Sequence, residues 1–367
     1  MNKHKLIGAE VSYYTGKVRA YLRYKAIAFE EIAASAEVYR DVIIPRTGVR
    51  FIPVLISDDD VAVQDSTEII DFLELRYPTE PVYPEGPVQR LAALVLETYG
   101  DEWLLLPAMH YRWNVAENRA FAIEEFGRLS APALQPAEQR ALGEQLSGPF
   151  AGALPALGIR PETVPAIEAS YHAFLADFDH HLASHLFLFG TRPSIGDFGL
   201  FGPLYAHLYR DPASGRLMKE RAPRVTGWVE RMRSPDARTG SFLAQDAVPA
   251  TLEPLLARVF AELGPVLAST VAAIAALTPK DGRVELPRRI GSHGFRIGDA
   301  TGERSIYPFN VWRWQRVHDA YQQLVGHERS RADALLERVG GIELLRAPLP
   351  RRLARVHNRL VLADSKP

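Results

Sequence analysis

The chain has 367 residues, of which 47% are apolar and 24% charged, a composition typical of a water-soluble globular protein with two or three domains. Its 43 basic and 44 acidic residues leave a net charge of −1, which argues against a nucleic acid or an anionic membrane as partner. It has no cysteine, which excludes a disulfide framework, a thiolate metal site and catalysis by an enzyme thiol.

The first residues lack the apolar run of a signal peptide, and the apolar run at 265–277 is too short to span a bilayer. We therefore expect a cytoplasmic protein.

The first 80 residues alternate between strand and helix patterns. Strands are predicted at residues 5–10, 29–33, 52–56 and 61–63, and helices at 16–28 and 65–76, with a short helical or irregular segment at 37–44. The order β-α-β-α-β-β-α predicts a small mixed sheet with helices on its faces.

Residues 77–87 carry four prolines and indicate a linker. The periodicity after it is almost entirely helical, at 88–113 with a break expected at Pro107, and then at 117–129, 161–185, about 195–209 and 223–232. Ser194 and Asp197 have the spacing of an N-capping box. From about residue 246 the character shifts: helices are predicted at 252–277, 307–325 and 327–339, around a glycine- and arginine-rich stretch and before a basic tail.

Two short motifs in the first domain point to a ligand site. Pro53 stands in an apolar strand pattern, where it must lie at the strand start or edge or follow a cis bond. That geometry would leave the backbone of Ile52 free to pair with a peptide. Asp65 and Ser66 open the next helix, where unpaired N–H groups and the positive helix end could hold the charged head of an amino acid.

These motifs, in this order, resemble the glutathione transferase superfamily over roughly residues 4–235. The segment from Ser12 to Arg19 resembles the family's link between first strand and first helix, Pro53 its cis-proline, Asp65-Ser66 its acid–serine pair, and Ser194 with Asp197 its capping box. The resemblance implies a thioredoxin-like glutathione-binding domain at 1–80, an all-helical substrate domain at 86–245 and, commonly, a homodimer. Residues 246–367 have no counterpart and form a mostly helical C-terminal extension.

The resemblance also implies catalytic residues. A cysteine-type thiol has a pKa near ~8.5, so a catalyst must stabilise its thiolate with a hydrogen-bond donor near a helix N-terminus. Ser12 stands at the family's catalytic position, and Tyr13, Tyr14 and Thr15 are alternative hydroxyl donors. The structural alternative is that Ser12 only caps the helix.

By the same resemblance, the backbone of Ile52 beside Pro53 and the pair Asp65-Ser66 would bind glutathione as co-substrate. Arg50 or Arg46 could meet its glycyl carboxylate. A pocket for a hydrophobic electrophile would include Trp103, His110, Tyr111 and Arg112, while the simpler interpretation of the tryptophans is that they are core residues. Asp177, His181 and His185 share a helix face, but the outer two lie about 12 Å apart along a straight helix, so no metal is predicted.

The leading functional prediction is a detoxifying glutathione transferase that activates the glutathione thiol for attack on an electrophile. The alternatives are a non-catalytic binding or interaction protein of the same fold and a ligandin-like carrier. The extension is expected to pack across the helical domain and to narrow the cleft or add to a dimer contact. A trans bond before Pro53, or a filled crevice between the lobes, would count against glutathione binding.

Overall fold

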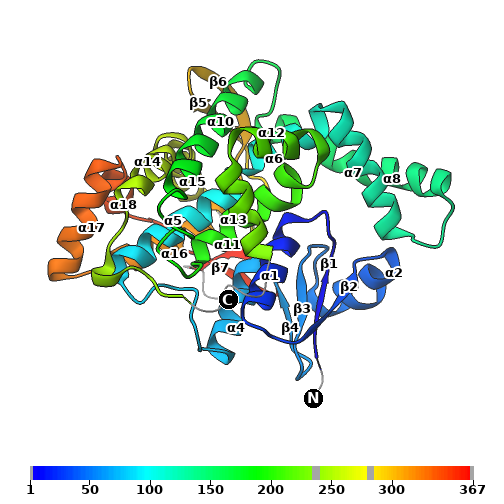
Figure 1. The fold of residues 1–367 in the computed structure, drawn as a ribbon, viewed down its shortest axis with the longest axis horizontal. Helices are drawn as coiled ribbons and strands as arrows, with labels where there is room; N and C mark the ends of the chain where they lie inside the picture. The colour runs from blue at the N-terminus through cyan, green and yellow to red at the C-terminus, as the bar shows by residue number, and fades with distance from the viewer. Residues whose placement is uncertain (1–2, 234–239, 279–284, 364–367) are drawn as a thin grey trace.

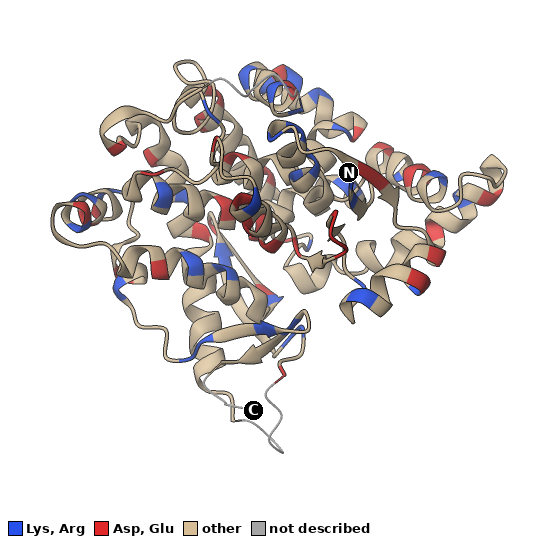
Figure 2. Cartoon of the chain, turned by 90° about the horizontal axis from the view of Figure 1, so that it is seen from below, with Lys and Arg blue, Asp and Glu red and all other residues tan. Residues whose placement is uncertain are grey.

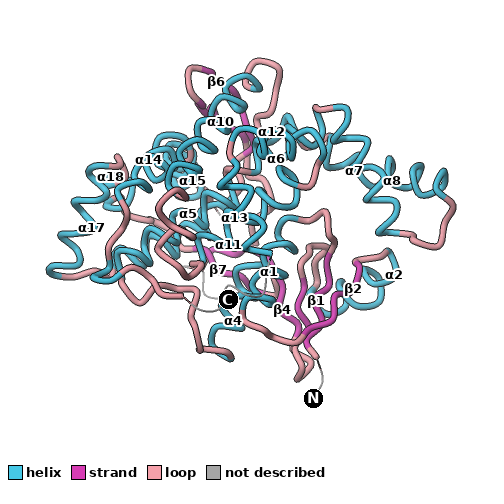
Figure 3. Tube along the Cα trace, in the orientation of Figure 1, coloured by secondary structure: helices cyan, strands magenta, loops and turns pink. Residues whose placement is uncertain are grey.

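The computed structural model describes residues 3–233, 240–278 and 285–363 (Figure 1). Each of the three predicted domains contains a few residues outside these ranges, namely 1–2, 234–239, 279–284 and 364–367. Strands gather in the N-terminal lobe and in two hairpins, and helices make up most of the rest (Figure 3). Basic and acidic residues lie interspersed along the helices (Figure 2).

The N-terminal lobe has the predicted order of elements. Its elements are β1 (His4–Gly8), α1 (Tyr13–Tyr24), β2 (Phe29–Ala33), α2 (Ala36–Val38), a π-helical turn (Tyr39–Ile43), α3 (Ile44–Thr47), β3 (Val54–Ile56), β4 (Ala62–Gln64) and α4 (Ser66–Arg76). The sheet has the order β2-β1-β3-β4, in which β1 runs parallel to β2 and antiparallel to β3, and β4 is antiparallel to β3. The predicted mixed sheet is confirmed.

Both faces of the central strands are covered. Leu6 and Leu55 point into the core that α1 and α4 share with the helical lobe. Ile7 and Val54, one position along each strand, pack instead against Ile43 on the other face. Because successive side chains alternate between faces, strands with apolar residues at consecutive positions are buried on both sides.

The helical lobe runs from the linker to Arg233. It contains α5 (Pro87–Glu102), α6 (Leu105–Asn114), α7 (Ala116–Ser130), α8 (Pro136–Ala151), α9 (Leu154–Leu157), α10 (Val164–His181), α11 (Ile195–Pro203), a π-helical segment (Leu204–Tyr209), α12 (Pro212–Arg221) and α13 (Pro223–Arg233). Residues 88–113, expected to form one long helix or a broken pair, form a broken pair, but the break does not lie at Pro107. The chain breaks between Glu102 and Leu105, and Pro107 sits in the first turn of α6, where no N–H is needed.

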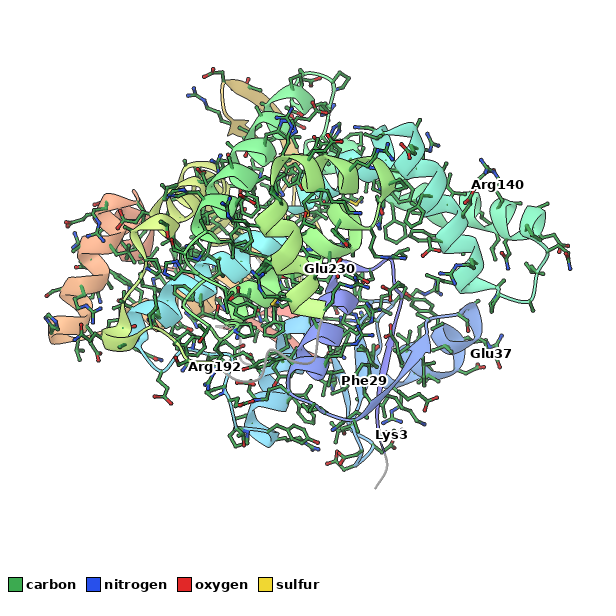
Figure 4. All side chains as sticks on the ribbon, in the orientation of Figure 1. Lys3, Phe29, Glu37, Arg140, Arg192 and Glu230 are labelled. Carbon is green, nitrogen blue, oxygen red and sulfur yellow. The ribbon has the colours of Figure 1, made fainter. Side chains whose placement is uncertain are left out.

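Helices α7 and α8 form an arm that projects from the body (Figure 1), and Arg140, labelled in Figure 4, lies on it. Helix α8 was not predicted. Only Gly143 and Ser147 of its sixteen residues are buried, so it lacks the apolar stripe by which a helix is recognised in sequence.

The centre of the helical lobe is the crossing of α5 and α11. A Cβ atom on Gly100 would come within 2.4 Å of the backbone of Gly199, so only glycine allows this close approach. The predicted capping box at the start of α11 is confirmed, because Asp197 accepts hydrogen bonds from the Ser194 N–H and hydroxyl, both at 2.8 Å. These contacts fix the helices on which the lobe interface is built.

The extension consists of two 3₁₀ turns (Ala244–Asp246 and Ala250–Leu252), α14 (Glu253–Glu262), α15 (Gly264–Ala275), β5 (Ser292–Ile297), β6 (Ala300–Ser305), α16 (Pro308–Gln322), α17 (Gly326–Arg338), α18 (Ile342–Arg346), β7 (Leu353–Val356) and β8 (Arg359–Leu362). Helices α16 and α17 were predicted, the single helix predicted at 252–277 is divided into α14 and α15, and α18 was not predicted. The hairpins β5–β6 and β7–β8 were not predicted, because arginine, and in β5 and β6 also glycine, stands at positions where β-branched or aromatic residues are usual.

Residues Ala250–Ala275 are long and apolar enough to cross a membrane by length and composition. In this structure they form α14 and α15, and half of the most apolar window is buried inside the protein.

The extension packs on the helical lobe. Asp246 caps the N-terminus of α5 and accepts from the N–H groups of Val88 at 2.9 Å and Gln89 at 2.8 Å. Helix α16 lies along α5 and buries Trp314 and Val317 in the common core (Figure 1). The extension is thus joined to the body through polar contacts and through a shared apolar core.

Candidate functional site

The predicted peptide-binding edge has the expected backbone geometry. The Ile52–Pro53 bond is cis, and Ile52 lies just before Val54, the first residue that β3 pairs with its neighbours. Among the described residues, no hydrogen bond reaches the backbone N–H or C=O of Ile52. A ligand strand pairing with Ile52 would therefore displace no hydrogen bond of the described residues.

Ser12 is the N-cap of α1. Ser12 is half-buried, and its Oγ accepts from the N–H of Thr15 at 3.3 Å, which is the capping role given above as the structural alternative. Thr15 itself is fully buried. A serine hydroxyl in this position keeps its own proton for donation, so capping and thiolate stabilisation are compatible.

Tyr13 and Tyr14 point their hydroxyls into the helical lobe. Both donate to the carbonyl oxygen of Asp101, at 3.1 and 3.0 Å, and their rings lie 3.9 Å apart. Burial raises the pKa of both, with a further contribution from Tyr14 for Tyr13 and from Glu102 for Tyr14. Each tyrosine is thus a protonated donor that is already engaged with the main chain.

Asp65 begins α4 as predicted, and its Oδ1 accepts from the N–H of Thr67 at 2.8 Å. Its Oδ2 is paired with Nη2 of Arg313, a residue of α16, at 3.1 Å. Asp65 is only 7% exposed and Ser66 only 1%. Burial by itself would raise the pKa of Asp65, but Arg313, with Arg355 and Lys17, lowers it, so the carboxylate is ionised and already compensated.

Arg313 is held by further partners at the lobe interface. Its Nη1 donates to Asp101 and to the Thr67 hydroxyl, each at 2.5 Å, and its Nε forms an ion pair with Glu102 at 2.8 Å. The Arg313 side chain is 4% exposed. A planar group with several donors suits such a set of oxygens.

Two further cations complete this group. Lys17 lies 2.7 Å from both Glu97 and Asp101, and Arg316 lies 2.9 Å from Glu97. We call these residues together the interlobe charge cluster: Lys17, Asp65, Glu97, Asp101, Glu102, Arg313 and Arg316. It joins the N-terminal lobe, the helical lobe and the extension.

The β7–β8 hairpin makes a second contact with the N-terminal lobe. Arg355 donates to the carbonyl of Gln64 at 3.0 Å and pairs with Glu68 at 2.6 Å. At the hairpin tip, Asn358 donates to the carbonyl of Thr47 at 2.9 Å. The hairpin thus reaches from the start of α4 to the end of α3.

The arginines predicted for the glycyl carboxylate lie at the surface. Arg50 is exposed, and Arg46 donates to the carboxylate of Asp60 at 3.0 Å. Their role in glutathione binding stays a prediction.

The residues predicted for an electrophile pocket lie inside the helical lobe. Trp103, His110, Tyr111 and Arg112 are at most 6% exposed. Each has a partner within the protein, and these partners are, in the same order, Glu262, Glu168, His172 and Asp211. The pocket assignment therefore stays a prediction.

Arg112 has a structural task. It binds both carboxylate oxygens of Asp211, at 2.8 and 2.7 Å, and donates to the carbonyl of Val11 at 2.9 Å. Since Val11 belongs to the N-terminal lobe, Arg112 ties the two lobes together.

The histidine-containing face of α10 is used within the protein. Asp177 pairs with Arg258 at 2.6 Å, and His181 shares a hydrogen bond with Thr251 at 2.8 Å. Within the described ranges, no group of three or more His, Cys, Asp or Glu side chains is placed to hold a metal ion.

Arg313 and Arg355 were missed by the sequence analysis. The sequence does hold a weak signal for Arg313, because it shares a helix face with Phe309 and Val317 at steps of four, which places a charge on an apolar stripe. Arg355 has no comparable signal. The partner Asp65 lies 248 positions away from Arg313, and no local pattern links them.

Two family models match parts of the two lobes. The sequence matches the glutathione S-transferase N-terminal domain model over residues 6–81 and the glutathione S-transferase C-terminal domain model over residues 161–231. No curated protein matches the sequence.

Several solved structures are similar. The beta-etherase LigF from Sphingobium sp. strain SYK-6 aligns with a TM-score of 0.46 and 19% identity, over 64% of this chain and 97% of that one. A glutathione S-transferase from Rhodospirillum rubrum F11 aligns with a TM-score of 0.42 and 17% identity, over 67% of this chain and 96% of that one. One from Methylobacterium radiotolerans, in complex with glutathione sulfonate, aligns with a TM-score of 0.40 and 20% identity, over 65% and 93% of the two chains.

The two domain models match the two lobes that the structure shows, in the order in which the lobes occur. The chain is therefore a member of the glutathione transferase superfamily that carries an additional C-terminal extension.

Proposed function

We propose that this protein is a non-catalytic member of the superfamily, a binding or interaction protein whose own extension covers the position at which glutathione would be held. The single observation behind the proposal is the ion pair between Asp65 and Arg313 at 3.1 Å. By the family resemblance, Asp65 and Ser66 would hold the charged γ-glutamyl end of glutathione. Here the carboxylate already has a cationic partner from the same chain.

Binding of glutathione at this position would require Arg313 to leave. Removing it would leave Asp65 and Asp101 buried without their guanidinium partner, and breaking a buried pair costs about 3–5 kcal/mol. The head group would also need space beside Ser66, which is 1% exposed. The ligand's ammonium group would replace only part of what Arg313 supplies.

Helix α16 is also packed too tightly to be displaced easily from the N-terminal lobe. Val311, Trp314, Val317 and Tyr321 are each at most 1% exposed. At about 1.5–3 kcal/mol for each fully buried side chain, exposing them costs roughly 6–12 kcal/mol, which is comparable to the total stability of a typical domain. If displacing α16 costs 6 kcal/mol, about one molecule in 10⁴ has the helix displaced. The apparent affinity for glutathione is then lower than that of the open state by the same factor.

The test is glutathione binding by the full chain. We expect no heat of binding at millimolar glutathione in calorimetry, no retention on glutathione resin and no conjugation of a generic aromatic halide. Glutathione binding is also measured for Arg313→Ala, which removes the internal cation. Arg296→Ala, at an exposed site, is its matched control. Saturable binding by the unaltered protein, lost in Asp65→Asn, would overturn the proposal.

A second candidate, glutathione transfer, is favoured by one specific observation. Among the described residues the Ile52 backbone makes no hydrogen bond, and the half-buried Ser12 stands at the N-terminus of α1. If the protein turns over an aromatic halide, Ser12→Ala should lower turnover far more than glutathione affinity, because the hydroxyl acts on the reacting thiolate. Tyr13→Phe and Tyr14→Phe are the controls for the alternative donors.

A further inference from the structure

A cavity of about 350 Å³, open to solvent, lies where the linker between the lobes meets the start of the extension. Its walls also include the first turn of α5 and the loop before α11. Three side chains, Pro81, Phe242 and Leu243, form an apolar wall. The volume lies within the range of about 300–1,000 Å³ that is typical of small-ligand sites. None of the lining residues belongs to the interlobe charge cluster.

Arg192, labelled in Figure 4, is the cation that lines this cavity. Its Nε donates to the carbonyl oxygen of Gly240 at 3.0 Å, and its guanidinium lies 5.5 Å from the ring centroid of Phe242. In the part of the chain that the structure describes, no hydrogen bond or ion pair reaches Nη1 or Nη2. The two terminal nitrogens are therefore free to donate, side by side, to both oxygens of one carboxylate.

Glu85 supplies an unpaired negative charge to the same cavity. It lies in the linker and is exposed. Within the described ranges its carboxylate has no ion pair and no hydrogen bond, and Arg192 does not pair with it. Two opposite charges thus line one cavity without contacting each other. A ligand that carries both charges could pair with both.

Gln89 adds a neutral acceptor to the cavity wall. It is only 1% exposed, and its amide nitrogen donates to the carbonyl oxygens of Leu243 and Ala247 at 2.9 and 2.8 Å. No hydrogen bond from a described residue reaches its Oε1, so this oxygen can accept from a ligand. The other acid of the cavity, Asp246, is already engaged, because its two oxygens accept from the N–H groups of Val88 and Gln89.

We propose that this cavity binds a free α-amino acid with an apolar side chain. The carboxylate of the ligand would accept from Nη1 and Nη2 of Arg192. Its ammonium group would donate to Glu85 and to Oε1 of Gln89, and its side chain would pack against the apolar wall. The site goes beyond the function proposed above, because it shares no residue with the glutathione position that α16 covers.

The test is calorimetric titration of the full chain with L-leucine and L-phenylalanine at constant pH and ionic strength. We expect saturable binding of at least one of them. Two analogues of L-phenylalanine separate its charges, since 3-phenylpropionate lacks the ammonium group and phenethylamine lacks the carboxylate. Each analogue should bind about tenfold more weakly than the amino acid or worse, because each loses hydrogen bonds between charged groups.

Substitutions then test the two charged residues. Arg192→Gln should weaken amino-acid binding by about tenfold or more, and Arg192→Lys should weaken it less, because lysine keeps the charge but loses the paired donors. Glu85→Gln should weaken it severalfold. Arg296→Gln and Glu303→Gln, at exposed positions of the β5–β6 hairpin, are the matched controls and should bind as the unaltered protein does.

No saturable binding of either amino acid, or unchanged affinity in Arg192→Gln, would overturn the proposal. Equal binding of 3-phenylpropionate or of phenethylamine would also overturn it, because the ligand class would be wrong. If Arg192→Gln does not fold, Glu85→Gln decides, since unchanged affinity in that variant counts against the site. Glutathione carries a polar amide in place of an apolar side chain at its amino-acid end, so it should not compete with L-leucine. The two proposals therefore fail independently.

Discussion

At the scale of single residues, two buried glutamates of the interlobe charge cluster differ strongly in acidity. Burial works against ionisation of both. For Glu97, Lys17 at 2.7 Å and Arg316 at 2.9 Å outweigh burial and lower its pKa to about 2. For Glu102, burial outweighs Arg313 and raises its pKa to about 7. The number of direct cationic partners decides which carboxylate is ionised.

The raised pKa of Glu102 predicts that Glu102→Gln changes how stability depends on pH. An unfolded glutamate has a pKa of 4.5, against about 7 in the fold. Between these values the folded state binds more protons, so rising pH lowers the free energy of unfolding. Glu102→Gln lacks this loss of stability. Relative to the unaltered protein, its free energy of unfolding should therefore rise from about pH 5 upward, by at most about 3 kcal/mol above pH 7.

Urea unfolding at several pH values measures this difference. Glu303→Gln, on the exposed face of β6, is the matched control. Its free energy of unfolding should depend on pH in the same way as that of the unaltered protein. A Glu102→Gln curve that is also parallel would show that Glu102 is ionised in the fold at neutral pH.

At the scale of elements, α16 and the β7–β8 hairpin cover the same region of the N-terminal lobe with different strength. Helix α16 buries Val311, Trp314, Val317 and Tyr321. The hairpin buries only Leu353 and Leu362, and its polar contacts with the N-terminal lobe come from Arg355 and Asn358. The hairpin is thus the element that can open at lower cost.

Native-state hydrogen exchange tests this order. We expect the amides of α16 to exchange only through global unfolding, with the same free energy as those of α5. The amides of β7 and β8 should exchange through a local opening that costs several kcal/mol less. Exchange of the α16 amides through a low-energy opening would mean that α16 can be displaced from the N-terminal lobe. Glutathione binding would then be favoured over the non-catalytic role proposed above.

The same elements show what the sequence could predict. The order of elements in the N-terminal lobe, the cis bond before Pro53 and the capping box at Ser194 each depend on residues close together in the chain. Helix α8 was missed because few of its residues are buried, and the hairpins because arginine, and in β5 and β6 also glycine, occupies their strands. The pairing of Asp65 with Arg313 joins residues far apart in sequence, so only the folded chain reveals it.

At the scale of the whole molecule, the extension is built into the fold. Trp228 of the helical lobe and Trp314 of the extension belong to the same buried core. The interlobe charge cluster joins all three parts of the chain, and Asp246 caps α5. The division into three domains stays a prediction, as do the homodimer and the cytoplasmic location.

This shared core predicts that the extension and the body unfold together. Among the five tryptophans, Trp228 reports on the body and Trp314 on the extension, so two single-tryptophan variants, with the others replaced by phenylalanine, separate the parts. Coincident urea midpoints and slopes are expected, because neither part keeps a closed core without the other. An earlier transition of Trp314, with Trp228 still folded, would show an extension that detaches on its own. In that case Arg313 could leave Asp65 at a cost below that of global unfolding, and the argument for a permanently covered glutathione position would fail.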